Sequence, residues 1–151
     1  MWCANLRDLI LFFNRKLTVM ESQYFHNKEI AMHTLGQMAD ACGMIIDWNK
    51  SVASVEDYVG SSDGMQKMAA CCMLLESIGE GVKKIDRLLP GFLLEHAPEI
   101  PWRSIKGLRD HIAHGYFNID ADVVYDVAIN EIPSLKAVFD NLVKELNNNA
   151  S

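Results

Sequence analysis

Several features are missing from this sequence of 151 residues, and each absence excludes a class of protein. No uninterrupted apolar stretch reaches the roughly 20 residues that a membrane-spanning helix needs, and polar and charged residues near the start argue against a signal peptide. The cysteines form no C-x-x-C pair, which argues against a disulfide framework or a zinc site. We therefore expect a cytoplasmic protein with no metal site, no cofactor and four buried free thiols: Cys3, Cys42, Cys71 and Cys72.

Positive charge is also in short supply. The chain has 14 lysines and arginines against 20 acidic residues, for a net charge of −6, which argues against broad, nonspecific binding of nucleic acid. Residues 101–116 differ, because they carry Arg103, Lys106 and Arg109 against Asp110 alone. We therefore expect any contact with RNA to be local, with Arg103 and Lys106 as candidate phosphate contacts.

Strand-period segments, glycine-rich phosphate loops and internal repeats do not stand out, whereas apolar residues recur at helical spacing. Ser61 to Gly64 either interrupt a helix that starts near Ser54 or cap the next one, Pro90-Gly91 ends a long helix, and Pro133 begins the last helix. Asp120 is a candidate helix cap. The spacing predicts helices over residues 6–17, 30–46, 65–89, 101–115, 120–127 and 133–146.

The fold class that this pattern predicts is all-α, an up-and-down helical bundle in one domain. We expect an N-terminal helix or extension over residues 1–20, the main domain over 21–147 and a frayed tail over 148–151. Met20 could instead be the start of a shorter protein, and the sequence does not decide between the two.

The run Arg109-Asp110-His111-Ile112-Ala113-His114-Gly115-Tyr116 is the most informative stretch. An arginine can hold a phosphate through a planar fork of donors, and a histidine can move protons near neutral pH. At 100° per residue, His114 points away from the core-facing arc, and Asp110 lies one turn earlier on nearly the same face. We therefore expect the Asp110 carboxylate to orient the His114 imidazole. The core-facing arc is formed by Trp102, Ile105, Leu108 and Ile112.

The same arithmetic puts Arg109 about 140° from His114, so the two are not neighbours on one ideal helix. Either the long arginine side chain curls around, or two copies of the helix face each other across a two-fold axis. The chemistry would be attack of a ribose 2′-hydroxyl on the adjacent phosphorus, with His114 moving protons and Arg109 stabilising the phosphorane. DNA lacks the attacking hydroxyl and should survive. His111 is a secondary candidate, whereas three further histidines have no organised partner: His26, His33 and His96.

The spacing Arg-x4-His-x-Tyr resembles the signature of HepT, the toxin ribonuclease of the HEPN superfamily. Residues 76–84, 98–109, 114–120 and 132–135 look like HepT in the same order. The resemblance covers about residues 22–146 and is most specific in its second half, whereas the first nineteen residues look additional.

This resemblance implies a HEPN bundle of four to five main helices, a homodimer with its active cleft at the interface, and metal-independent cleavage of RNA, either tRNA or mRNA. It also implies a type VII-like toxin-antitoxin pair, in which a minimal nucleotidyltransferase antitoxin transfers AMP from ATP to Tyr116. A bulky phosphate-bearing group two residues from His114 would occupy the phosphate site and repel RNA. The alternative is a catalytically inactive HEPN dimer that serves as an interaction or nucleotide-binding module for such a partner.

Overall fold

The structure is a computed structural model that describes residues 5–115 and 118–148. Cys3 and Tyr116 lie outside these ranges. The described part contains helices and no strand, which confirms the all-α bundle. The elements are α1 (Leu6–Trp48), α2 (Glu56–Val59), α3 (Ser62–Leu88), α4 (Phe92–His96), α5 (Trp102–His114), α6 (Ala121–Asp126), the π-helical segment η1 (Val127–Glu131) and α7 (Ile132–Asn148).

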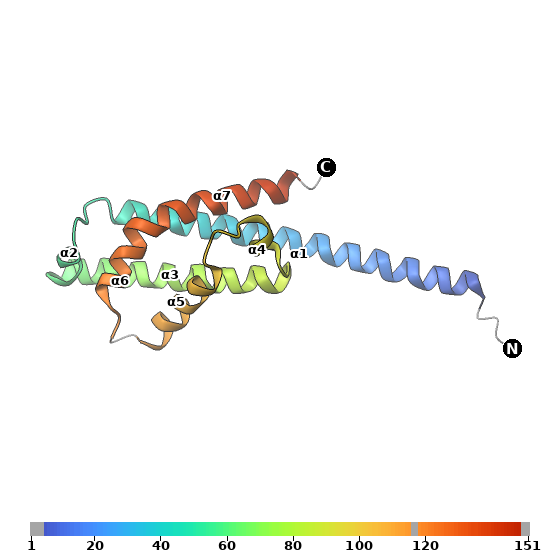
Figure 1. Cartoon of the computed structure of the whole chain (residues 1–151), viewed down its shortest axis with the longest axis horizontal. Helices are drawn as coiled ribbons and strands as arrows, with labels where there is room; N and C mark the ends of the chain where they lie inside the picture. Colours follow the sequence, from blue (N-terminus) through green and yellow to red (C-terminus); the bar gives the residue numbers. More distant parts are fainter. Residues whose placement is uncertain (1–4, 116–117, 149–151) are drawn as a thin grey trace.

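The bundle is built around the two longest helices. α1 packs against α7 on one side and α3 on another, and α5 packs against the outer side of α3 (Figure 1). α1 runs antiparallel to both α3 and α7, as expected of an up-and-down bundle (Figure 1). The motif helix α5 therefore lies at the surface of the bundle, supported by α3.

The first helix differs from the sequence-based expectation. The segments predicted over residues 6–17 and 30–46 form one helix, α1, from Leu6 to Trp48. Residues 18–29 contain neither glycine nor proline, so nothing in them breaks the helix. The helix also passes without interruption through residue 20, where we expected an extension to meet the main domain.

Two of the predicted helix caps are confirmed. The Ser61 side chain accepts a hydrogen bond from the Gly64 backbone N–H at 3.0 Å, so Ser61 caps α3 rather than extending α2. The Asp120 carboxylate accepts from the Asp122 backbone N–H at 2.9 Å and caps α6. These caps fix where α3 and α6 begin.

The chain does not restart at Pro133 as predicted, because α6, η1 and α7 follow one another without a loop. A proline lacks the backbone N–H and its ring collides with the carbonyl four residues earlier. The π-helical segment η1 ends at Glu131, two residues before this proline, and contains Ile129, the residue whose carbonyl the ring would meet. Pro133 is therefore accommodated in a continuing helical path.

Buried thiols line the core, as predicted for Cys42, Cys71 and Cys72. Beside them, the buried Tyr58 hydroxyl donates to Asn49 Oδ1 at 2.5 Å, and the Asn49 amide donates to Cys71 Sγ at 3.1 Å. The predicted absence of a membrane span is in line with the described helices, since none is both long and apolar enough to cross a bilayer.

Candidate active site

The motif helix α5 is fixed at its start by a tryptophan. The Trp102 indole N–H lies 3.1 Å from the Leu93 carbonyl and 2.9 Å from the Ala97 carbonyl, which ties α5 to the preceding α4 turn. Trp102 and Ile112 are buried, and Ile105 and Leu108 are partly buried against the core. The predicted core-facing arc is therefore confirmed, and the opposite face of α5 is left to solvent.

α3 and α5 lie in close contact at Gly79. A β-carbon at this position would overlap the Cβ of Arg109 and would stand 3.3 Å from the Ile105 carbonyl oxygen. Gly81, two residues further along α3, turns toward α1, where a β-carbon would overlap the Met38 thioether. Since residues two apart point to different sides of a helix, the two glycines let α3 sit close to both neighbours.

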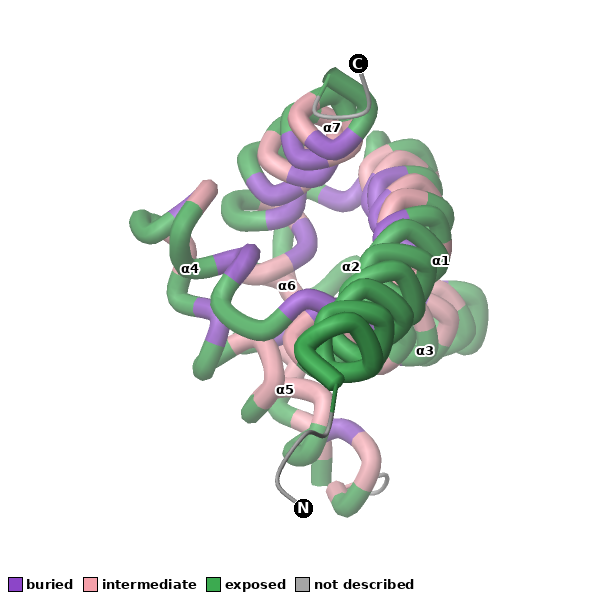
Figure 2. The backbone as a smooth tube through the Cα atoms, turned by 90° about the vertical axis from the view of Figure 1, so that its right-hand side faces the viewer, coloured by how far each residue is buried: buried purple, intermediate pink, exposed green. Residues whose placement is uncertain are grey.

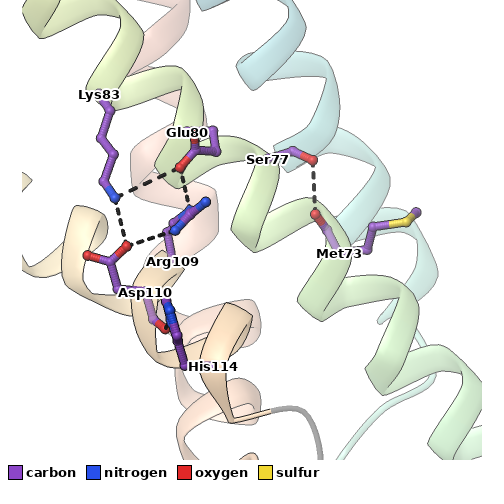
Figure 3. A network of polar contacts seen from close by, with 7 residues as sticks. All are labelled: Met73, Ser77, Glu80, Lys83, Arg109, Asp110 and His114. Carbon is purple, nitrogen blue, oxygen red and sulfur yellow. Dashed lines mark hydrogen bonds and ion pairs between the residues drawn. The ribbon is translucent and has the colours of Figure 1, made fainter.

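Four charged side chains from α3 and α5 form a network at this contact (Figure 3). The Arg109 guanidinium pairs through Nε with Glu80 and through Nη1 with Asp110 Oδ1, the latter at 3.0 Å. Lys83 Nζ lies 2.7 Å from the same Asp110 oxygen and 3.8 Å from Glu80 Oε1. Two cations therefore face two carboxylates, and the network as a whole is neutral.

These contacts shift the acid–base behaviour of the network. The Lys83 ammonium and, to a lesser degree, Arg109 lower the pKa of Asp110 below its ordinary value of 3.8. The hydrogen bond to Asp110, aided by Glu80, raises the pKa of Arg109 above its ordinary value. Arg109 thus stays charged and is held by α3 in a defined position, with its side chain only 25% exposed.

His114 is the last residue of α5, and its ring is held by the backbone of the preceding turn. Its Nδ1 lies 2.8 Å from the Asp110 carbonyl oxygen. A carbonyl can only accept, so Nδ1 donates, and Nε2 of the neutral ring is left to accept a proton. The prediction that the Asp110 carboxylate contacts His114 is wrong, because this carboxylate binds Lys83 and Arg109 (Figure 3). The backbone carbonyl of Asp110 orients the imidazole instead.

The glycine after His114 explains why the helix stops there. A β-carbon on Gly115 would stand 2.8 Å from the His111 carbonyl oxygen, closer than real side chains come. Gly115 therefore lets the chain turn away and leaves the imidazole exposed at the helix end.

Other candidates named from the sequence are placed as follows. Lys106 Nζ lies 2.5 Å from Asp86 Oδ2, so this lysine is paired with α3. Arg103 and His111 are exposed, and neither has a hydrogen bond or ion pair within the described residues. In that same part of the chain nothing bonds Arg109 to His114. Tyr116 lies outside the described residues.

Sequence reasoning did not assign a role to Glu80 and Lys83, the α3 residues that hold Arg109 and Asp110. Both lie within residues 76–84, a segment that looked like HepT, and the two nearby glycines were the available signal for a close helix contact.

Known proteins resemble this chain over about two thirds of its length or more. A family model described as Ribonuclease HepT-like matches residues 38–142. The protein named "Putative RNase MJ0125" from Methanocaldococcus jannaschii is 34% identical over 102 residues, covering 68% of this chain and 81% of that protein. The "Probable ribonuclease HepT" of Thermococcus cleftensis is 33% identical over 110 residues, covering 73% and 93% respectively.

No solved structure matches the chain with significance. The family model spans well over half of the sequence and includes the α3–α5 contact, the charged network and His114. The chain belongs to the HepT-like ribonuclease family.

Proposed function

We propose that this ribonuclease cleaves RNA by metal-independent transesterification, with His114 as the proton-transfer residue and Arg109 as the phosphate ligand. The observation that carries the proposal is the orientation of His114 by the Asp110 carbonyl, which leaves Nε2 exposed and able to accept a proton. In the reaction the ribose 2′-oxygen loses its proton to a base and bonds to phosphorus. The P–O5′ bond then breaks, and the 5′-oxygen gains a proton, leaving a 2′,3′-cyclic phosphate and a 5′-hydroxyl end.

Arg109 would bind the phosphate with the donors that the network leaves over. Its Nε pairs with Glu80 and its Nη1 pairs with Asp110, whereas its Nη2 forms no bond with the described residues. A guanidinium carries five N–H donors, so the remaining ones are able to reach a phosphate oxygen. Because the network is neutral, Arg109 would contribute little long-range attraction for RNA. Its main role would be to position the phosphate.

A homodimer would resolve the separation of Arg109 and His114. The two side chains leave α5 in different directions, Arg109 toward α3 and His114 at the helix end (Figure 3). A second copy across a two-fold axis would bring its own His114 and Arg109 to the same cleft, so that one imidazole acts as base and the other as acid. Arg103 and His111, both exposed on α5, would line the approach of the RNA.

The cleavage test uses an RNA oligonucleotide in EDTA and the same oligonucleotide with deoxyribose at the cleaved position. We expect cleavage of the first and survival of the second, and His114→Ala should slow cleavage about 10²- to 10⁴-fold. His26→Ala is the matched control, because His26 is exposed on α1 and has no part in the charged network at α5. Cleavage that needs a divalent metal, or that survives His114→Ala, would refute the mechanism.

One observation favours the alternative of an inactive binding module. The charge of Arg109 is already compensated by Glu80 and Asp110, which weakens its attraction for RNA. A module of this kind would bind its partner or a nucleotide and leave both oligonucleotides intact. The cleavage assay therefore separates the two functions.

We further propose that the protein is the toxin of a type VII-like pair and is silenced when a nucleotidyltransferase adenylylates Tyr116. The Tyr116 phenol oxygen would attack the α-phosphorus of ATP, and pyrophosphate would leave. Co-expression with a nucleotidyltransferase encoded in the neighbouring reading frame should add the mass of one AMP to the intact chain. Tyr116→Phe should remain toxic and gain no mass, whereas an added AMP on Tyr116→Phe would place the modification elsewhere.

A further inference from the structure

The first half of α1 projects beyond the bundle with apolar side chains in solvent. We call residues 6–26 the overhang; every one of them is exposed (Figure 2). Six of its apolar residues are 51–71% exposed and follow one another at steps of four and three: Leu6, Ile10, Phe13, Leu17, Met20 and Tyr24. A seam of this spacing is typical of a helix that pairs with another helix.

The seam is a direct continuation of the face that α1 buries in the bundle. The same steps of three and four lead from Tyr24 through Asn27 to five residues that are buried in the core: Ala31, Thr34, Met38, Ala41 and Ile45. One unbroken stripe therefore runs the length of α1, covered in its second half and uncovered in its first.

The packing of α3 and α7 against α1 ends near Asn27. The Asn27 side-chain amide donates to the carbonyl of Leu88, the last residue of α3, at 3.1 Å. Beyond this contact, toward the N-terminus, neither α3 nor α7 accompanies α1 (Figure 1). The overhang is thus a helix face shaped for a partner that this chain does not supply from its described residues.

We propose that the partner is the overhang of a second copy, paired antiparallel along this seam. In that register Leu6 of one copy lies opposite Tyr24 of the other, Ile10 opposite Met20, and Phe13 opposite Leu17, so every seam residue finds a counterpart. Leu6, the first residue of the overhang, then lies opposite Tyr24, about one helical turn before Asn27, where the bundle of the other copy begins. The two seams therefore overlap over their full length.

A parallel pairing does not fit the same geometry. The face that follows Asn27 is occupied by the α3 and α7 of the same chain. A parallel second copy would have to place its own bundle in that space, whereas an antiparallel copy places it at the far end. Antiparallel pairing also keeps the two acidic bundles apart, because a helix of 21 residues is roughly 31 Å long.

Charge supports the antiparallel register. Arg7 and Glu21 each follow a seam residue, Leu6 and Met20, on the same flank of α1. In the antiparallel pair, Arg7 of one copy lies beside Glu21 of the other, and the two-fold axis repeats the contact. Lys16 lies near the two-fold axis, opposite Lys16 of the other copy, and its long side chain can extend into solvent there.

The size of the contact suits a homotypic interface better than a membrane surface. Two faces of this length bury on the order of 1,000 Å² in total, which is the lower range of specific interfaces. A membrane-bound helix typically carries a basic polar face. Here three bases and two acids lie outside the seam, so the overhang has no strongly basic face, and the chain as a whole is acidic.

Light scattering of the purified full chain tests the proposal through a matched pair of phenylalanines. Phe13 is in the seam and 55% exposed, whereas Phe12 is outside it and 62% exposed. We expect Phe13→Gln to halve the mass of the assembly and Phe12→Gln to leave it unchanged. A chain that starts at Met20 should show the same halved number of chains per assembly, and an equal number of chains in all four proteins would overturn the proposal.

Charge reversal tests the register, and vesicles test the competing surface. Arg7→Glu should weaken self-association, and adding Glu21→Arg should restore it; failure of the double variant to recover would reject the antiparallel register. The wild type and the Phe13→Gln variant should bind equally weakly to vesicles of neutral and anionic phospholipid. Binding that depends on Phe13, with no change of mass, would assign the overhang to a membrane instead.

These measurements are independent of the proposed chemistry. The overhang contributes no residue to the α5 network, so Phe13→Gln should retain RNA cleavage per chain. Loss of the seam should lower the mass in either case, to that of the monomer if no second interface forms at α5 and to that of the α5 dimer if one does.

Discussion

Gly79 of α3 lies directly against the side chain of Arg109 on α5, so that a β-carbon on the glycine would overlap the Cβ of the arginine. This contact places the arginine of the motif within reach of Glu80, the residue next to Gly79. The position of the guanidinium thus depends on the absence of one methyl group on another helix.

Gly79→Ala should therefore destabilise the protein. Overpacking costs about 1–3 kcal/mol and outweighs the roughly 1 kcal/mol that alanine gains over glycine in a helix. Gly107→Ala on α5 is the control, because a β-carbon there meets nothing within 4 Å and should stabilise the helix. Urea unfolding of both variants measures the difference, and equal stability of the two would contradict the contact.

Trp102→Phe should cost about 1–3 kcal/mol, because it removes the indole N–H that faces the Leu93 and Ala97 carbonyls in the interior. Trp48→Phe makes the same change at a partly buried position whose indole has no hydrogen bond to the described residues. Thermal unfolding should show a larger loss for Trp102→Phe. A larger loss for Trp48→Phe would mean that the indole bonds do not anchor α5.

The Asp110 carboxylate should stabilise the fold at neutral pH and not in acid. Its pKa is lowered in the folded state, chiefly by Lys83, so its contribution is complete above the ordinary value of 3.8 and is lost as the pH falls through the lower folded value. Asp110→Asn should therefore melt at a lower temperature than the wild type at pH 7. The two melting temperatures should converge toward pH 2, and a constant gap would refute the ion pairs as the cause.

The core thiols should resist alkylation until the protein unfolds. Burial raises the pKa of Cys42 to about 12 and that of Cys72 to about 11, and it also raises the pKa of Cys71. Only the thiolate is nucleophilic, so little of the reactive form exists at pH 8. A Cys3→Ser variant should therefore react with a thiol reagent only in denaturant. Rapid labelling of the native variant would show that the core opens.

Local chemistry accounts for what could be predicted. Ser61 and Asp120 act as caps because each has its acceptor oxygen next to unsatisfied N–H groups, and such a bond spans two or three residues. The inward arc of α5 follows from helical periodicity alone. These features need no knowledge of the rest of the fold.

Features that depend on contact with another helix were either not predicted or predicted wrongly. The Asp110 carboxylate lies near His114 on a helical wheel, but Lys83 of α3 draws it away, and a wheel contains no α3. The turn at η1 was missed because a proline favours the first turn of a helix, and only the structure shows that the helical path continues through Pro133.

The sequence by itself determined the helices, most of their ends and the chemical groups of the motif, because periodicity, capping and residue type act within a few residues along the chain. Only the tertiary structure decided that Glu80 holds Arg109, that a backbone carbonyl orients His114, and that the seam of α1 loses its cover at Asn27. The physical reason is that each of these depends on which helix packs beside which, and on how closely.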